Sequence, residues 1–132
     1  MEGIDPCVLV IFGASGNLAF NKLLPSLYRL EEAQCLPDGV RVVGVARREW
    51  NTEQWRQEVE LKLRAELGAR VDATIVKCLL ARLDYFAGDF LKADVYGALH
   101  KHLEDPERYA GNRIYYMSIR PADFKIVAGL LA

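Results

Sequence analysis

Val10-Ile-Phe-Gly-Ala-Ser-Gly-Asn-Leu-Ala19 is the stretch of sequence that decides the fold. It starts within an unbroken apolar run, Cys7–Phe12, of the kind that forms a parallel strand covered on both faces. After the glycine-containing turn, apolar residues within 22–35 recur at three- and four-residue steps, as in a helix with one buried face. A strand, a glycine turn and a helix in this order predict the first unit of an α/β domain.

The small residues of this turn are spaced to suit a phosphate group. Gly13 permits a tight turn out of the strand, and Gly16 lacks a Cβ that would keep a pyrophosphate from the backbone N–H groups at the positive end of the helix. Ala19 permits close packing of the helix on the strand. Because the spacing is GxxGxxA and not GxGxxG, a plain small-residue turn remains the alternative interpretation at this point.

Strands and helices are predicted to alternate along the rest of the chain. Apolar and aromatic runs predict strands at 41–46, 83–88 and 113–119, the last introduced by Gly111 and Asn112. Apolar residues at helical spacing predict helices at 52–68, 72–81, 92–103 and 122–132. Asn51 or Thr52 would cap the first of these. Short connections between these elements predict a doubly wound parallel sheet, a Rossmann-like dinucleotide-binding α/β domain. Because the last stripe has no helix-end signal, we expect the chain to be cut within a βα repeat.

Composition indicates one ordinary soluble globular domain. The 132 residues are 52% hydrophobic and 27% charged, with 17 Lys and Arg against 18 Asp and Glu. This balance lacks the dense basic stripe of a nucleic-acid-binding protein. No run approaches the ~18 apolar residues of a membrane-spanning helix. Because the apolar segment Cys7–Phe12 also follows Asp5 and Pro6 and not a positive leader, we expect a cytoplasmic protein. Cys7, Cys35 and Cys78 fit neither a disulfide framework nor a metal site, so we expect buried free thiols.

A basic pair follows the second predicted strand, which ends Gly44-Val-Ala-Arg-Arg48. At this position, sites for NAD usually carry an Asp or Glu that binds the ribose hydroxyls, whereas sites for NADP carry an arginine near the additional phosphate. The planar guanidinium of Arg47 suits a ribose 2'-phosphate. The alternative for Arg47 is a solvated surface position, and Arg48 either adds charge to the site or faces water.

The remaining polar and aromatic residues give weaker signals. Lys22 lies in the first turns of the helix, where it either meets a phosphate at the mouth of the site or is an exposed helical lysine. His100 and His102 lie two residues apart on a late helix and are interpreted as surface residues. The two tryptophans, Tyr115 and Tyr116 are assigned to the core. The sequence offers no Ser/His/Asp set, metal cluster or convincing general base for hydride chemistry.

Several segments of the chain, taken together, carry a family resemblance. They are Val10 to Ala19, Lys22-Leu-Leu-Pro25, Val43-Gly-Val-Ala-Arg47, Ala81-Arg82, Tyr85 to Gly88, Tyr96 and Asn112-Arg-Ile-Tyr-Tyr116. They resemble the N-terminal coenzyme domain of glucose-6-phosphate dehydrogenases over nearly the whole chain. The pattern of that family is a strand, then GASGDLA, then a lysine and a proline opening the helix, with an arginine closing the next strand.

This resemblance implies a coenzyme site. Arg47 would bind the 2'-phosphate of NADP, and Lys22 would contact the substrate between the nicotinamide side and the sugar phosphate. Backbone around Ser118 and Pro121 would flank the nicotinamide ribose. The coenzyme phosphates would lie on the glycine turn, which consists of Gly13, Ala14, Ser15, Gly16, Asn17 and Leu18.

The resemblance also implies the activity of a longer enzyme. Residues 1–132 would be its NADP-binding domain, without the substrate and dimerisation domain that carries the catalytic histidine. The full-length enzyme is expected to oxidise glucose 6-phosphate to 6-phosphogluconolactone with NADP+ and to form a homo-oligomer only when full length. This chain alone is expected to be inactive.

Two departures from the family pattern leave other interpretations open. Asn17 replaces an aspartate, and Ile119-Arg120-Pro121 replaces a more apolar segment that ends in two prolines. A change of charge at either place would alter the field in the pocket and with it the coenzyme preference. The alternatives are a non-catalytic NADP-binding sensor and an interaction module that uses the same fold.

Overall fold

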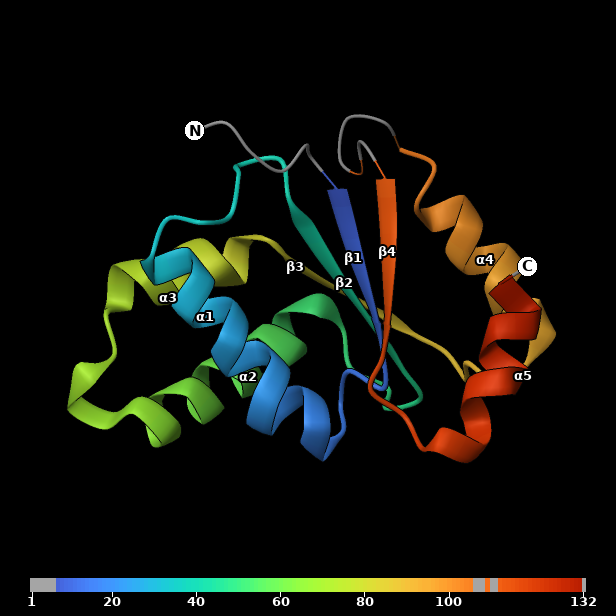
Figure 1. Ribbon diagram of the computed structural model, residues 1–132, viewed down its shortest axis with the longest axis horizontal. Helices are drawn as coiled ribbons and strands as arrows, with labels where there is room; N and C mark the ends of the chain where they lie inside the picture. Colours follow the sequence, from blue (N-terminus) through green and yellow to red (C-terminus); the bar gives the residue numbers. More distant parts are fainter. Residues whose placement is uncertain (1–6, 106–108, 110–111, 132) are drawn as a thin grey trace.

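The computed structural model of the chain describes residues 7–105, 109 and 112–131. Its centre is a sheet of four parallel strands in the order β3-β2-β1-β4 (Figure 1). The strands are β1 (Cys7–Phe12), β2 (Arg41–Ala46), β3 (Leu83–Ala87) and β4 (Asn112–Met117). The chain passes from β1 to β2 and β3, and then crosses back so that β4 pairs with the free side of β1. This reversal is the switch point at which open α/β sheets bind their ligands.

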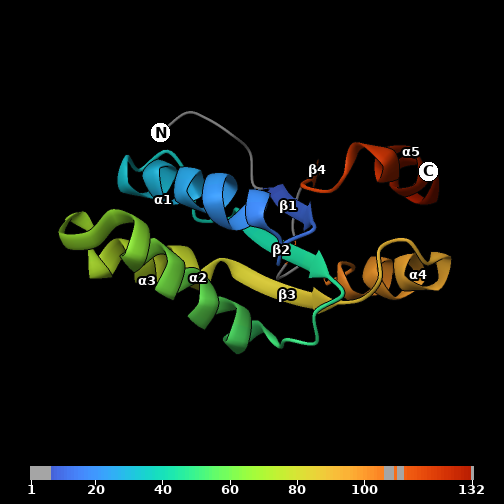
Figure 2. The ribbon, with the colours of Figure 1, turned by 90° about the horizontal axis from the view of Figure 1, so that it is seen from below.

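Helices cover both faces of the sheet. Their bounds are η1 (Ala19–Leu23), α1 (Leu24–Glu32), α2 (Thr52–Leu67), η2 (Gly68–Arg70), α3 (Ala73–Ala81), α4 (Ala93–His102) and α5 (Pro121–Leu131). Figure 2 shows α1, α2 and α3 on one side of the sheet and α4 and α5 on the other. Successive residues of β1 serve opposite sides, since Ile11 belongs to the core beneath α1 and α2 whereas Val10 and Phe12 belong to the second core. The prediction of a doubly wound parallel sheet is therefore confirmed.

Local capping explains where two of the helices begin. Asn51 Oδ1 accepts a hydrogen bond from the Gln54 N–H at 2.8 Å, and Gln54 Oε1 accepts one from the Asn51 N–H at 2.9 Å. This capping box selects Asn51 from the two predicted caps of α2. The carboxylate of Asp72 accepts a hydrogen bond from the Thr74 N–H at 2.8 Å and so caps α3.

The structure corrects several predicted boundaries. The helix predicted at 22–35 is already helical at Asn17, because the turn is complete at Gly16, and it ends at Glu32. The strand predicted to reach Ile119 ends at Met117. Two other predicted positions, Gly111 and the helix end at 132, lie outside the described residues.

The expected burial of some side chains was also wrong. Cys7 is buried as predicted, but Cys35 and Cys78 are exposed; all three are free thiols. The expectation that Tyr115 and Tyr116 belong to the core fails because β4 is an edge strand, which has a neighbour on one side only. The exposed fractions of these two tyrosines are 38% and 40%.

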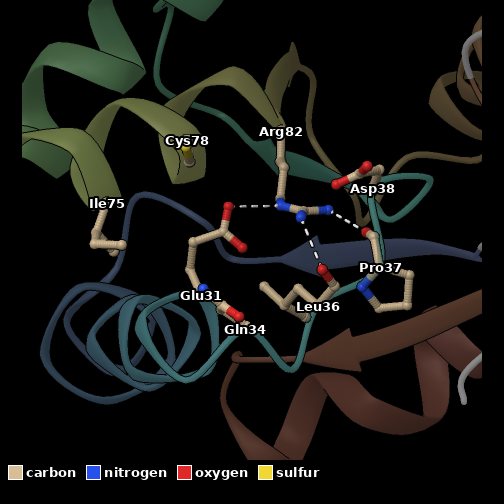
Figure 3. Close-up of a pocket in the computed structure, with 8 residues that line it drawn as sticks. All are labelled: Glu31, Gln34, Leu36, Pro37, Asp38, Ile75, Cys78 and Arg82. Atoms are coloured by element: carbon tan, nitrogen blue, oxygen red, sulfur yellow. Dashed lines mark hydrogen bonds and ion pairs between the residues drawn. The ribbon is translucent and has the colours of Figure 1, made fainter. Parts of the chain in front are cut away.

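The loop between α1 and β2 is held by a buried arginine at the amino ends of β2 and β3 (Figure 3). Arg82 Nε donates to Glu31 Oε1 at 3.1 Å, and its terminal nitrogens donate to the carbonyls of Leu36, Pro37 and Val40. Arg82 and Glu31 line a pocket of about 510 Å³. Because every guanidinium nitrogen has an acceptor, we interpret this cluster as part of the scaffold.

Two kinds of feature are absent from the described part of the chain. None of its helices combines the length and the apolar character needed to cross a membrane. None of its His, Cys, Asp and Glu side chains form a group of three or more placed to hold a metal ion.

Candidate functional site

The turn after β1 is fixed by its contacts with β2 and β4. Gly13 has a φ of +84°, which an L side chain rarely adopts, and its N–H donates to the Val45 carbonyl at 2.8 Å. A Cβ on Gly13 would lie only 2.3 Å from the carbonyl oxygen of Ser118. The position therefore requires glycine both for its backbone conformation and for the close approach of the chain after β4.

The second half of the turn presents backbone N–H groups at the start of a helix. Gly16 N–H donates to the Gly13 carbonyl at 3.0 Å, and the Gly16 carbonyl accepts from Phe20 at 3.2 Å. Within the described part of the chain, the N–H groups of Ser15, Asn17 and Leu18 make no backbone hydrogen bond. Free N–H groups at a helix start carry partial positive charge and bind anions.

Gly16 keeps the space next to these N–H groups open. Apart from its neighbours in the chain, a Cβ at this position would meet only one atom of the described residues within 4 Å, the Gly13 carbonyl oxygen at 3.3 Å. The turn is supported from beneath, where Trp55 Nε1 donates to the Ala14 carbonyl at 3.3 Å. A Cβ on Gly44 would lie 2.7 Å from both Ala14 Cβ and the Trp55 ring, so Gly44 permits this packing.

The turn forms one wall of a cleft of about 570 Å³ at the carboxyl ends of β1, β2 and β4. Two other hollows on the surface, of about 510 and 470 Å³, do not include the turn, and the cleft's place at the switch point makes it the candidate site. The residues that line it are Gly13, Ser15, Gly16, Leu18, Ala46, Arg47, Arg48, Phe90, Ser118, Ile119, Arg120 and Asp123.

Two arginines stand where β2 enters the cleft. Arg47 is exposed and directly follows the buried end of the strand. The guanidinium carbon of Arg48 lies 4.8 Å from the centre of the Trp50 ring, and the Arg48 carbonyl accepts a hydrogen bond from Tyr85 Oη at 2.7 Å. Burial raises the pKa of Tyr85 to about 12, so this hydroxyl stays a neutral donor at ordinary pH.

The chain after β4 forms the opposite wall. Buried Ser118 donates to the Phe12 carbonyl through both its N–H, at 2.9 Å, and its Oγ, at 2.7 Å. Beyond it, Arg120 Nε and Nη2 donate to the two carboxylate oxygens of Asp123 at 3.2 and 3.3 Å. The side chain of Asp123 is 10% exposed and that of Arg120 is 77% exposed.

The structure brings together most of the residues predicted for the site. Gly13, Ser15, Gly16, Leu18, Arg47 and Ser118 line the cleft. Three predicted residues do not line it. Ala14 is fully buried under the turn, while Asn17 and Lys22 are exposed on the helix that follows it. His100 and His102 are exposed on α4 and do not line the cleft, as predicted.

Sequence reasoning missed Phe90 and Asp123, both of which line the cleft. Phe90 comes shortly after β3, so the rule that ligands bind at the carboxyl ends of parallel strands offered a signal for it. Asp123 lies three residues after Arg120, in the first turn of α5, and that spacing is typical of an ion pair on one side of a helix.

Comparison with known proteins places this site in a family context. The family model described as "Glucose-6-phosphate dehydrogenase, NAD binding domain" matches residues 10–132. The glucose-6-phosphate 1-dehydrogenase of Chlamydia muridarum is 36% identical over 95% of this chain and 25% of its own length. That of Buchnera aphidicola subsp. Schizaphis graminum is 40% identical over 76% of this chain and 19% of its own length.

Solved structures show the same relationship. The crystal structure of glucose-6-phosphate 1-dehydrogenase from Mycobacterium avium matches 96% of this chain and 26% of its own chain, with a TM-score of 0.83 and 27% identity. A glucose-6-phosphate dehydrogenase in complex with its substrate glucose-6-phosphate matches with a TM-score of 0.84 and 29% identity, over 96% and 27% of the two chains. The chain thus spans about a quarter of the length of the relatives it matches.

Proposed function

The chain belongs to the glucose-6-phosphate dehydrogenase family, as its N-terminal NAD(P)-binding domain, and on this premise we propose that its cleft binds NADP+. One observation carries the proposal: the glycine turn after β1 and Arg47 at the end of β2 line the same cleft at the switch point of the sheet. The turn that would hold the phosphates and the arginine that would lie at the ribose therefore line one cleft, which supports the proposal.

The donor set of the cleft fits an anionic dinucleotide. The N–H groups of Ser15, Asn17 and Leu18 would hold the diphosphate, and Gly16 leaves room for it. The backbone near Ser118 would lie beside the nicotinamide ribose. When bound, the nicotinamide supplies the hydride acceptor, whereas the protein binds and orients it.

Arg47 is the residue proposed to select NADP+ over NAD+. Its guanidinium can donate two parallel hydrogen bonds to a 2'-phosphate, a group that NAD+ lacks. Arg48 lines the same part of the cleft, but its guanidinium lies over the Trp50 ring. We therefore propose that Arg48 contributes positive charge to the cleft without binding the 2'-phosphate directly. Because no carboxylate of the described residues forms an ion pair with Arg47, its charge is available to the ligand.

We propose further that residues 1–132 are the coenzyme domain of an enzyme that oxidises glucose 6-phosphate to 6-phosphogluconolactone in the cytoplasm. In that enzyme a further domain would supply the catalytic residues and the homo-oligomer contacts, and the coenzyme domain would contribute Lys22 to the sugar phosphate. The exposure of three successive large side chains of the edge strand β4 supports a larger protein that would cover them, since Ile114 is 52%, Tyr115 38% and Tyr116 40% exposed. Exposed Lys22 on η1 is free to meet a group outside the cleft.

The proposal is tested by titrating the chain with NADP+ and NAD+ in a calorimeter at one low salt concentration. Wild type is expected to bind NADP+ more tightly. Arg47→Ala is expected to weaken NADP+ binding by roughly 10- to 100-fold and to leave NAD+ binding nearly unchanged, because only NADP+ loses charge-assisted hydrogen bonds. Arg70→Ala, at an exposed arginine outside the cleft, is the matched control. Equal losses for both coenzymes, or no binding to wild type, would contradict the proposal.

A further inference from the structure

The ion pair between Arg120 and Asp123 places a charged group in the cleft that the proposed function leaves without a role. Both residues line the cleft, and each carboxylate oxygen of Asp123 accepts one hydrogen bond from Arg120. The Asp123 N–H also donates to the Arg120 carbonyl at 2.9 Å, which closes a turn at the start of α5. The backbone and the carboxylate together fix where the guanidinium stands.

This pairing leaves the guanidinium able to bind a second anion. An arginine has five N–H donors, and Asp123 takes two of them. The other three have no partner in the described part of the chain, and the side chain is 77% exposed. Asp123 is the reverse case: it is nearly buried and lies in the first turn of α5, where the helix dipole stabilises its charge.

Arg120 and Arg47 stand on opposite sides of the glycine turn. Arg47 follows β2 and Arg120 follows β4, and these two strands flank β1. In a dinucleotide-binding fold, the two nucleotide halves of the ligand lie across the crevice at the switch point, and the adenosine ribose lies at the end of the second strand. The part of the cleft next to β4 would therefore receive the nicotinamide nucleotide half of the ligand.

We propose that Arg120 binds the phosphate of the nicotinamide half of the coenzyme, while Asp123 holds its guanidinium in place. The inference rests on the proposed function and deepens it by assigning a second arginine to the other nucleotide half of the same ligand. The cleft then holds the 2'-phosphate through Arg47 and the central diphosphate through the N–H groups of the glycine turn, with Arg120 on the phosphate of the nicotinamide half.

The test uses two ligands that differ in the nicotinamide half. NADP+ has both halves, whereas 2',5'-ADP has the adenosine and its 2'-phosphate but no nicotinamide nucleotide. Arg120→Ala is expected to weaken NADP+ binding about tenfold, the effect of losing one partly exposed charge-assisted hydrogen bond, and to leave 2',5'-ADP binding unchanged. Arg47→Ala is expected to weaken binding of both ligands. The affinity of Arg120→Lys for NADP+ is expected to fall between those of wild type and Arg120→Ala.

Lys125→Ala is the matched control, because it removes one positive charge from an exposed position of α5 that does not line the cleft. It is expected to change neither affinity. Circular dichroism of each variant checks that the fold is kept. An equal loss of both ligands in Arg120→Ala, or no loss of NADP+, would overturn the inference and leave the proposed function standing. If wild type bound neither ligand, the proposed function would fall and the inference with it.

Discussion

Replacement of Arg82 by methionine should be the most destabilising single change at the amino ends of the strands. Arg82 and Glu31 are almost completely buried, with side-chain exposures of 9% and 8%. The substitution keeps much of the apolar volume but removes the ion pair and the three hydrogen bonds to loop carbonyls. It leaves the carboxylate of Glu31 without its cationic partner, which is the costly part.

The expected loss follows from this geometry. Removing one partner of a buried ion pair costs about 3–5 kcal/mol, and the pocket of about 510 Å³ beside the pair gives water some access to Glu31. We therefore expect the lower end, about 3 kcal/mol, which is a large share of the ~5–15 kcal/mol stability of a typical domain. Adding Glu31→Leu removes the unpaired buried carboxylate. The double variant should therefore lose less stability than the sum of the losses in the two single variants.

Urea unfolding followed by tryptophan fluorescence and circular dichroism measures these differences. The matched control is Arg64→Met, which breaks an exposed ion pair with Glu60 of 2.9 Å and should cost less than about 0.5 kcal/mol. A loss below about 1 kcal/mol in Arg82→Met would refute the reasoning, because the guanidinium would then contribute no more than a surface charge. Strict additivity with Glu31→Leu would show that the two side chains are not coupled.

Two further predictions concern the turn and the tyrosines. Gly13→Ala should destabilise the fold by at least about 2 kcal/mol in urea unfolding and weaken coenzyme binding, because Gly13 has a positive φ and lies close to Ser118. The control Gly97→Ala, at a helical position with open space, should be neutral or stabilising. Equal effects of the two substitutions on stability would argue against the strained turn. Burial raises the pKa of Tyr85 and of Tyr96 to about 12, so their ionisation, followed by absorbance at 295 nm, should be complete only well above pH 10. Because the unfolded chain loses these protons first, stability should fall as the pH rises from about 10 towards 12, and a Tyr85→Phe variant with an unchanged titration curve would contradict the assignment.

Features that depend on neighbouring residues along the chain were predictable. The apolar run of β1, the glycine turn and the stripe of the next helix follow one another within about thirty residues, and their order alone led to the α/β fold. Arg47 was predictable for the same reason, since it directly follows the second strand. The error at the start of the first helix arose because the recurring leucines begin at Leu23, whereas the helical backbone begins at Asn17 and already buries Ala19.

Features that depend on strand order could not be derived in this way. The exposure of Tyr115 and Tyr116 follows from the edge position of β4, although their residue types favour burial. Arg120 and Asp123 come within the same cleft as Arg47 only because β4 pairs with the free side of β1.

The sequence by itself thus determined which elements form and where the glycine turn lies, because strand runs, glycine turns and helix caps are set by contacts between residues close along the chain. Only the tertiary structure decided that the second wall of the cleft carries an arginine held by a nearly buried aspartate, and that Lys22 lies outside it. The physical reason is that β4 pairs with β1 through backbone hydrogen bonds between residues far apart along the chain, such as Phe12 and Met117, and no local pattern of the sequence indicates this pairing. Because β2 pairs with the other side of β1, Arg47 and Arg120 reach the same cleft.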